Sequence, residues 1–334
     1  MTRRTVPGMR IIVYGAGAIG GVIGGRLFEH GHDVVLIARG AHHDAIASDG
    51  LRLEWAEGSA TLPVPVVSGP ANVSWTGDDV VLLAMKSQDT DGALAALAGE
   101  APPDTPVVCA QNGVDNERRT LRYFENTYGM CVMCPATHLE PGVVQATSSP
   151  VSGILDVGRY PAGLDDVAER LSTAVVDSTF ASEPRADIMR WKYRKLIMNL
   201  GNALDALCGI EARFGEIGKL ARREGEAVLA AAGIDLVTSA EDRERRGDLL
   251  TMKEVGGSGR VGSSSAQSLA RATGTIESDH LNGEIALLGR LHGVPTPVNE
   301  TLQREARRAA AEHRPPGSMT EADLLAYLGR NPAS

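Results

Sequence analysis

The chain of 334 residues is long enough for about two domains of ordinary size. Hydrophobic residues make up 43% and charged residues 22%, a composition that excludes a mainly disordered chain. The 33 basic and 42 acidic residues leave a net charge of −9, which argues against a broad nucleic-acid-binding face. No apolar run approaches the roughly 20 residues that span a bilayer, and no signal-peptide core precedes the first strand-like segment. We therefore expect a cytoplasmic protein that does not enter the membrane.

The first half of the chain alternates strand-like and helix-like segments. Strands are expected at Arg10–Tyr14, Asp33–Ala38, Asp79–Met85 and Pro106–Gln111, a hairpin at Leu51–Trp55 and Ala60–Val67, and one or two antiparallel strands in Val143–Val157. Helices are expected at Gly20–His30, Asp91–Gly99 and Ala162–Ala174. This rhythm predicts βαβ units and a parallel sheet that is covered on both faces.

The second half has helical periodicity throughout. Residues 185–233 have apolar positions three and four apart, and further helices are expected at Ile276–His292, Pro297–His313 and Thr320–Leu328. The charged run 241–247 is expected to be a solvated helix face, and the Gly/Ser-rich residues 252–265 a mobile loop. The sequence therefore predicts an α/β domain over 1–185 and an all-helical domain over 186–334.

Cysteine usage is sparse, with four residues in the whole chain, too few for a disulfide scaffold. Cys131 and Cys134 have C-x-x-C spacing, but they lie in an apolar strand-like run without a second ligand pair. No other cluster has metal-ligand spacing, so we expect no metal.

A glycine-rich turn, GAGAIG at residues 15–20, directly follows the first strand and opens a helix. Gly15 permits the sharp turn, Gly17 lets the backbone approach a diphosphate, and Gly20 allows close packing of helix on strand. The helix N-terminus adds unpaired N–H groups for the anion. The pattern predicts a Rossmann-type dinucleotide-binding domain whose turn comprises Gly15, Ala16, Gly17, Ala18, Ile19 and Gly20.

The end of the second strand distinguishes the two nicotinamide dinucleotides. A carboxylate there binds the ribose 2′-hydroxyl of NAD, whereas an arginine accommodates the 2′-phosphate of NADP. This sequence has Arg39 and no acid at that position, which favours NADP.

Five segments together resemble the ketopantoate reductases. They are MRIIVYGAGAIGG at 9–21, DVVLLAMKSQDT at 79–90, VVCAQNGVDN at 107–116, WKYRKLIMNLGNAL at 191–204 and IESDHLNGEIALLGRLHGVPTPVN at 276–299. This family comprises NADPH-dependent 2-dehydropantoate 2-reductases of pantothenate biosynthesis. The resemblance covers nearly the whole chain and implies a Rossmann domain, a helical domain and a cleft between them.

The resemblance also implies roles for individual residues. Lys86, with Arg39, matches the cationic contacts to the cofactor phosphates, and Asn112 matches a residue that orients cofactor and substrate. Lys195 matches the catalytic lysine, and Asn199 and Asn202 resemble the two substrate-binding asparagines.

Glu277 matches the acidic residue that contacts the substrate and the lysine, and a preceding serine completes the family's site. Spacing from Glu277 favours Ser265, and Ser264 stays open because the Gly/Ser-rich segment can shift the register.

Ketone reduction needs a proton at oxygen as well as hydride at carbon, and a lysine ammonium can supply it. Its ordinary pKa of about 10.4 must fall toward neutrality, which burial promotes and a neighbouring carboxylate opposes. Lys195, Asn199 and Asn202 are four and three residues apart, so one helix would present all three on one face. Lys192, one turn earlier, is a rival that only the Lys-Leu-x-x-Asn pattern disfavours.

One departure from the family pattern concerns the asparagines, which are three residues apart here and usually four apart in the family. We therefore expect reduction of a branched 2-oxo acid, with 2-dehydropantoate as the leading candidate and another 2-oxo acid as the alternative. A non-catalytic NADP(H)-binding redox sensor is a third reading, disfavoured by Lys195 and Glu277. The expected partner is a small 2-oxo acid, and the sequence is compatible with a homodimer.

Overall fold

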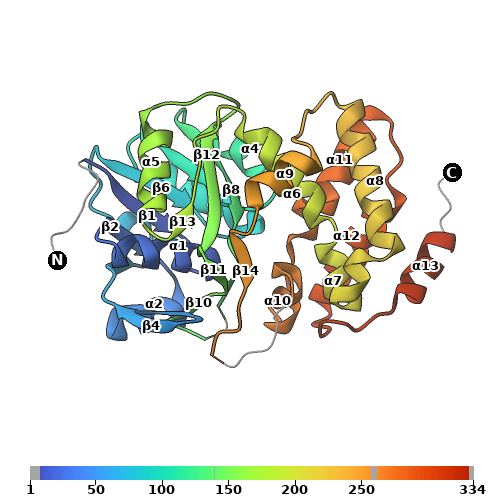
Figure 1. Ribbon diagram of the computed structural model, residues 1–334, viewed down its shortest axis with the longest axis horizontal. Helices are drawn as coiled ribbons and strands as arrows, with labels where there is room; N and C mark the ends of the chain where they lie inside the picture. The colour runs from blue at the N-terminus through green and yellow to red at the C-terminus, as the bar shows by residue number, and fades with distance from the viewer. Residues whose placement is uncertain (1–7, 139, 257–261, 331–334) are drawn as a thin grey trace. The chain divides into compact units, whose positions relative to one another are not determined.

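The computed structural model describes residues 8–138, 140–256 and 262–330. The chain divides into two compact units (Figure 1). We call residues 1–192 with 239–259 the sheet unit, and residues 193–238 with 260–334 the helical unit. The predicted α/β class, with a parallel sheet first and helices after it, is confirmed. In the described part of the chain, no helix is both long and apolar enough to cross a membrane.

The main sheet of the sheet unit has the strand order β13-β12-β8-β7-β6-β1-β2-β5. The six neighbouring strands β5, β2, β1, β6, β7 and β8 are parallel. Their spatial order is the 3-2-1-4-5-6 arrangement of a doubly wound dinucleotide-binding sheet. Strand β12 pairs with β8 in antiparallel orientation, as the sequence predicted for this region. The bounds are β1 (Arg10–Tyr14), β2 (Asp33–Ile37), β5 (Val66–Val67), β6 (Asp79–Leu83), β7 (Val107–Cys109), β8 (Thr127–Met133), β12 (Gly153–Arg159) and β13 (Phe180–Ala181).

Helices cover both faces of this sheet. Successive side chains of a strand point to opposite faces, and both sets are apolar in β1, so both faces must be buried. Ile11 and Val13 of β1 belong to the same buried cluster as α1 (Ala18–Glu29) and α5 (Asp166–Val176). Ile12 belongs to a second cluster with α3 (Thr90–Ala98). Alternate side chains of β1 therefore contribute to two separate hydrophobic clusters. The remaining short helices of this half are α2 (Gly40–Asp49), α4 (Asn116–Thr120), η1 (Pro70–Asn72) and η2 (Ser87–Asp89).

A second, smaller sheet has the order β4-β3-β10-β9. Its strands are β3 (Leu51–Trp55), β4 (Gly58–Leu62), β9 (Ala136–Thr137) and β10 (Val143–Ala146). The expected hairpin is confirmed between β3 and β4, although the segment predicted at 60–67 divides, because Val66 and Val67 join the main sheet. Strand β10 pairs in parallel with β3 and antiparallel with β9.

The division between the units differs from the single boundary expected after residue 185. It falls inside α6 (Ile188–Asn199), after Lys192, and the chain returns to the sheet unit for residues 239–259. The returning segment forms α9 (Ser239–Arg246) and β14 (Leu250–Met252), and β14 pairs with β11 (Ser148–Pro150).

A buried ion pair fixes the returning segment. The Nη2 and Nε atoms of Arg245 lie 2.6 and 3.0 Å from the two carboxylate oxygens of Asp156 on β12. Both side chains are under 10% exposed, and Asp156 also accepts the backbone N–H of Glu183. The charged run 241–247 is therefore not a wholly solvated face, because Arg245 points inward to this carboxylate.

The helical unit contains the second part of α6 and the other helices expected for this half. They are α7 (Asn202–Cys208), η3 (Ile210–Phe214), α8 (Glu216–Ala231), α10 (Ser264–Ala270), η4 (Glu277–His280), α11 (Asn282–His292), α12 (Pro297–Ala311) and α13 (Glu321–Arg330). Within the expected mobile loop at 252–265, residues 257–261 lie outside the described residues, while Met252 ends β14 and Ser264 begins α10.

Candidate active site

Two of the three motif glycines are required by packing of the protein itself. Gly15 has φ +102°, and a Cβ there would lie 2.7 Å from the backbone nitrogen of Met85. A Cβ on Gly20 would lie 2.1 Å from the carbonyl oxygen of Gly15. Both contacts are closer than real Cβ atoms tolerate. Glycine at 15 lets the turn approach the segment after β6, and glycine at 20 lets α1 pack against the turn.

Gly17 is different, because no described atom beyond its two chain neighbours lies within 4 Å of a Cβ built on it. It is the N-cap of α1 and has an extended backbone with φ −67°. Neither packing nor backbone conformation explains a glycine here. The open space lies at a helix N-terminus, where unpaired N–H groups attract an anion. These residues fit the diphosphate of a dinucleotide.

We expect alanine at Gly17 to weaken dinucleotide binding and alanine at Gly20 to destabilise the fold. Gly17→Ala should raise the Kd of a bound dinucleotide at least about tenfold, since the methyl group occupies the approach of the diphosphate. Its free energy of unfolding should change by about 1 kcal/mol or less, the scale of an N-cap substitution. Gly20→Ala should instead destabilise the fold by about 1–3 kcal/mol through overpacking. Thermal denaturation and dinucleotide titration of both variants check this, and equal loss of stability in both would contradict it.

The three polar cofactor candidates follow the carboxyl ends of parallel strands. Arg39 follows β2, Lys86 follows β6 and Asn112 follows β7. These strands are parallel members of one sheet, so the residues lie at the same edge, where open α/β sheets bind ligands. The Arg39 side chain is 77% exposed, and its Nη2 lies 4.0 Å from Asp89, the last residue of η2. A guanidinium this exposed can reach a phosphate at modest desolvation cost.

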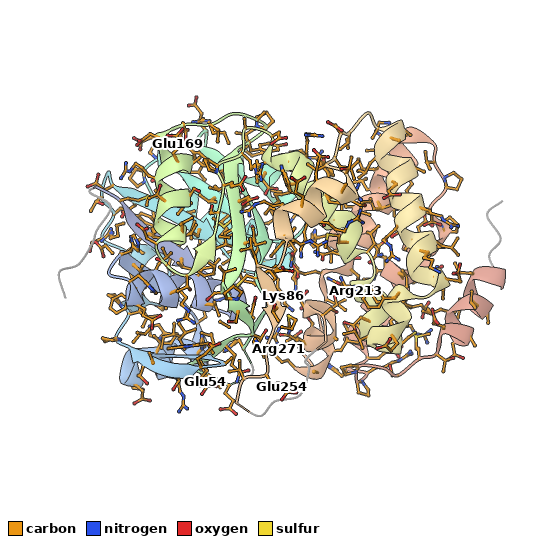
Figure 2. The ribbon with its side chains drawn as sticks, in the orientation of Figure 1. Glu54, Lys86, Glu169, Arg213, Glu254 and Arg271 are labelled. Atoms are coloured by element: carbon orange, nitrogen blue, oxygen red, sulfur yellow. The ribbon has the colours of Figure 1, made fainter. Side chains whose placement is uncertain are left out.

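Hydrogen bonds join the turn that carries Asn112 to the segment that carries Lys86. The carbonyl oxygen of Asn112 accepts from Asn116 Nδ2 at 3.1 Å and from Ser87 Oγ at 3.4 Å. Gln111 Nε2 donates to the carbonyl oxygen of Met85 at 2.9 Å. The two candidate binding turns are thus held together within the sheet unit. Figure 2 labels Lys86.

Lys192, the rival of Lys195, is used inside the sheet unit. It is 3% exposed and forms an ion pair with the fully buried Glu117. Its Nζ also donates to the carbonyl oxygens of Gln111 at 3.0 Å, Met130 at 3.3 Å and Cys109 at 3.4 Å. An ammonium has three N–H groups, so these partners leave none for a substrate. Burial raises the pKa of Glu117 above its ordinary value, with Lys192 opposing the shift.

The helix that was expected to carry Lys195, Asn199 and Asn202 is interrupted. Lys195 lies in α6, Asn199 is its last residue, and Asn202 is the first residue of α7. The single continuous face predicted from the spacing is therefore wrong. Leu200 and Gly201 separate the two helices.

Side chains from elsewhere in the helical unit stabilise this interruption. Arg213 of η3, labelled in Figure 2, donates from Nη2 to the carbonyl oxygen of Met198 at 3.1 Å. In a continuous helix that oxygen would accept from the N–H of Asn202. Asn282 Nδ2 likewise donates to the carbonyl oxygen of Leu200 at 3.0 Å. Two of the carbonyl groups at the break, those of Met198 and Leu200, are thus satisfied by side chains.

A buried polar network supports Asn282 in turn. Its Nδ2 also donates to Asn299 Oδ1 at 2.9 Å, and Asn299 Nδ2 donates to Glu224 at 2.8 Å. Glu224 further accepts the backbone N–H groups of Val298 and Asn299, both at 2.9 Å, at the start of α12. Burial raises the pKa of Glu224, and these N–H donors oppose the shift. No role for Asn282 was predicted, although it lies in the segment 276–299 that resembles the family.

The substrate candidates of the helical unit are buried polar side chains. Asn199 and Asn202 are each 4% exposed, and Glu277, the first residue of η4, is 6% exposed. Asn202 Oδ1 is buried and has no hydrogen-bond partner among the described residues. Such an acceptor is costly to bury without a donor, and a ligand N–H or O–H group would satisfy it.

The serines of 263–265 differ in their surroundings. Ser263 Oγ caps α10 by accepting the N–H of Ala266 and donates to the carbonyl oxygen of Asn202 at 3.3 Å. Ser265 is 2% exposed, whereas Ser264 is half-buried. Both stay candidates for the substrate-binding serine, and Ser263 has a structural use. No group of three or more His, Cys, Asp or Glu in the described ranges could hold a metal ion.

Comparison with known proteins places the chain in a family. Residues 11–161 match the model of ketopantoate reductase PanE/ApbA, and residues 187–310 match that of its C-terminal part. The chain is 33% identical to a 2-dehydropantoate 2-reductase of Pyrococcus horikoshii over 63% of this chain and 66% of that protein. It is 28% identical to that of Archaeoglobus fulgidus over 88% of this chain and 95% of that protein.

Solved structures agree with this placement. A PanE/ApbA family ketopantoate reductase from Ralstonia eutropha JMP134 has a TM-score of 0.76 at 29% identity, covering 92% of this chain and all of that one. A D-mandelate dehydrogenase, solved with NADH and anilino(oxo)acetate, shares the fold with a TM-score of 0.74 at 23% identity, over 91% and 99% of the two chains. The chain therefore belongs to the ketopantoate reductase family, whose members are NAD(P)-dependent oxidoreductases acting on C=O and CH–OH groups.

Proposed function

We propose that this protein reduces a branched 2-oxo acid to the 2-hydroxy acid with NADPH, and that 2-dehydropantoate is the substrate, as in pantothenate biosynthesis. When bound, the dinucleotide supplies the hydride for the carbonyl carbon. Lys195 donates the proton to the carbonyl oxygen, and its ammonium stabilises the negative charge that develops there. Glu277 holds this ammonium and contacts the substrate. Cytoplasmic location and a homodimeric state stay predictions.

The observation that carries the choice of substrate is the buried Oδ1 of Asn202, which lacks a donor among the described residues. The 2-dehydropantoate molecule has a hydroxyl group at C4, which can donate to this oxygen. A simple alkyl 2-oxo acid has no such group and would leave the acceptor unpaired. Sites built to hydrogen-bond a substrate hydroxyl reject analogues without it strongly. Asn199 and Ser264 or Ser265 supply further polar contacts to the small acid.

A panel of 2-oxo acids, each assayed with NADPH and with NADH, tests this proposal. We expect the highest kcat/KM with 2-dehydropantoate. Trimethylpyruvate, which differs only in replacing the CH2OH group by methyl, should be poorer by about 10²-fold or more. Preference for benzoylformate would favour the alternative that the altered asparagine spacing allows, a related reductase of another 2-oxo acid. Absence of turnover with every member of the panel would contradict the proposed enzyme activity and favour the alternative of a non-catalytic NADP(H)-binding redox sensor.

Arg39 is the proposed contact of the 2′-phosphate, and its substitution separates NADPH from NADH. Arg39→Ala should raise the KM for NADPH by about 10- to 100-fold, because a charge-assisted contact to phosphate is lost. The KM for NADH should change less than threefold, since NADH has a hydroxyl at that position. Arg52 offers a matched control, because it is an exposed arginine paired with Glu54 on the small sheet. Equal weakening of both dinucleotides would remove Arg39 from this role.

A further inference from the structure

A histidine outside every assigned role contacts the glycine-rich turn. His42 lies on α2, and its Nε2 is 2.7 Å from the carbonyl oxygen of Ala16. Its other ring nitrogen, Nδ1, accepts the backbone N–H of Gly142 at 2.9 Å. An atom that accepts from an N–H carries a lone pair and no proton. The ring is therefore the neutral form with its proton on Nε2, and that N–H donates to Ala16.

The surroundings of His42 favour this state. Burial lowers the pKa of His42 below the ordinary histidine value, and the nearby His138 adds to the shift. The two imidazole rings have centroids 4.2 Å apart, and His138 Nδ1 lies 3.0 Å from the carbonyl oxygen of Val143. Gly142 has φ +78°, and a Cβ on it would lie 3.0 Å from the Cβ of Ala45 on α2. This close approach brings its N–H to the imidazole.

The contact with Ala16 sets the direction of the next N–H. A trans peptide is planar, so the carbonyl of Ala16 and the N–H of Gly17 point in opposite directions. The hydrogen bond to His42 holds the Ala16 oxygen on the side of α2. The Gly17 N–H consequently points away from α2. The carbonyl of Gly17 begins the helical ladder by accepting from Gly21 at 2.6 Å, so this peptide lies directly before the first helical bond.

We propose that His42 is a positioning residue of the dinucleotide site. Its neutral imidazole orients the Ala16–Gly17 peptide so that the Gly17 N–H faces the diphosphate, and no other segment fills the space where a Gly17 side chain would lie. This inference rests on the proposed binding of a nicotinamide dinucleotide. It adds a residue that never touches the ligand and acts only through the backbone of the turn.

The test measures dinucleotide affinity in variants of the full chain. His42→Ala should raise the Kd for NADPH about tenfold, the scale of one lost hydrogen bond, and kcat at saturation should stay within twofold. Adenosine 2′-monophosphate lacks the diphosphate, so its Kd should not change. His43→Ala is the matched control, since His43 lies on the same helix and pairs with Asp44 at 3.0 Å. Its NADPH affinity should equal that of the wild type.

Two conservative variants cover the case in which His42→Ala does not fold. A glutamine amide can place an N–H donor near the position of Nε2, whereas an asparagine can reach only the position of Nδ1. His42→Gln should therefore recover most of the affinity for NADPH, and His42→Asn should bind as weakly as expected for alanine. Thermal denaturation checks that both are folded.

The outcomes separate the inference from the proposed function. A wild-type chain that binds neither NADPH nor NADH overturns both. Normal NADPH affinity in His42→Ala, or in a folded His42→Asn, overturns only the positioning role. Parallel loss of affinity for NADPH and adenosine 2′-monophosphate also overturns it, because that result indicates general damage to the sheet unit.

Discussion

Replacing Lys195 by alanine should lower kcat by about 10²- to 10⁴-fold, the usual contribution of a positioned general acid. Steady-state kinetics with the best 2-oxo acid measure this effect, and the Kd for NADPH should stay within about threefold. The expectation depends on Lys195 as the proton donor. Lys192, one turn earlier in α6, belongs to the sheet unit: it donates to three carbonyl oxygens and forms an ion pair with Glu117.

Lys195→Arg separates proton transfer from charge. Arginine keeps the positive charge but stays protonated at pH values at which proteins are folded, so it should not restore kcat. A small primary amine added to Lys195→Ala should restore part of the activity in proportion to its concentration. Unchanged kcat in Lys195→Ala would mean that another group donates the proton.

Replacing Lys192 by methionine should reduce the free energy of unfolding by about 3–5 kcal/mol. The variant leaves the Glu117 carboxylate fully buried without its counter-charge, and the carbonyl oxygens of Cys109, Gln111 and Met130 lose the N–H groups of Lys192. Urea denaturation at neutral pH measures the loss. Glu117→Gln added to Lys192→Met should recover part of it, since the amide removes the unpaired charge, and the double-mutant cycle gives the coupling energy.

The pH dependence of this loss has a definite sign. The pKa of Glu117 is already raised by burial in the wild type, and removal of Lys192 raises it further. A raised carboxyl pKa means that stability is retained below the unfolded-state value and lost as pH rises through the folded-state value. The deficit of Lys192→Met should therefore shrink toward acidic pH. A stable Lys192→Met variant that has lost kcat would instead give Lys192 a chemical role.

The sequence predicted the core of the fold because the β1, β2, β6 and β7 strands are short apolar runs with helices between them. It missed α2, in which Ile46 is the only residue that the structure describes as buried, so no apolar periodicity marks the helix. The return of residues 239–259 was also missed. That return is held by the ion pair between Arg245 and Asp156, 89 residues earlier. A local sequence pattern cannot predict a partner so far away along the chain.

Part of the candidate site could be predicted from the sequence and part could not. The glycine turn and Arg39 follow from strand-turn-helix logic, and the residues at 195–202 and 277 came from the family resemblance. The interruption after Asn199 could not be predicted, because the groups that satisfy its carbonyls, Arg213 and Asn282, are 15 and 82 residues away from them. His42 stands in a polar segment without periodicity, and its role depends on Gly142, 100 residues later.

The path of the chain between the units has a consequence for engineering. Neither unit is a continuous stretch of sequence, since residues 239–259 belong with 1–192. A fragment ending near residue 190 would lack Arg245, and the buried Asp156 would keep only Arg185, at 3.4 Å, as a cationic neighbour among those described. Exchange of the helical unit between relatives must therefore transplant two separate segments, 193–238 and 260–334, and leave the intervening residues with the sheet unit. A single crossover point would divide a buried ion pair between two parents.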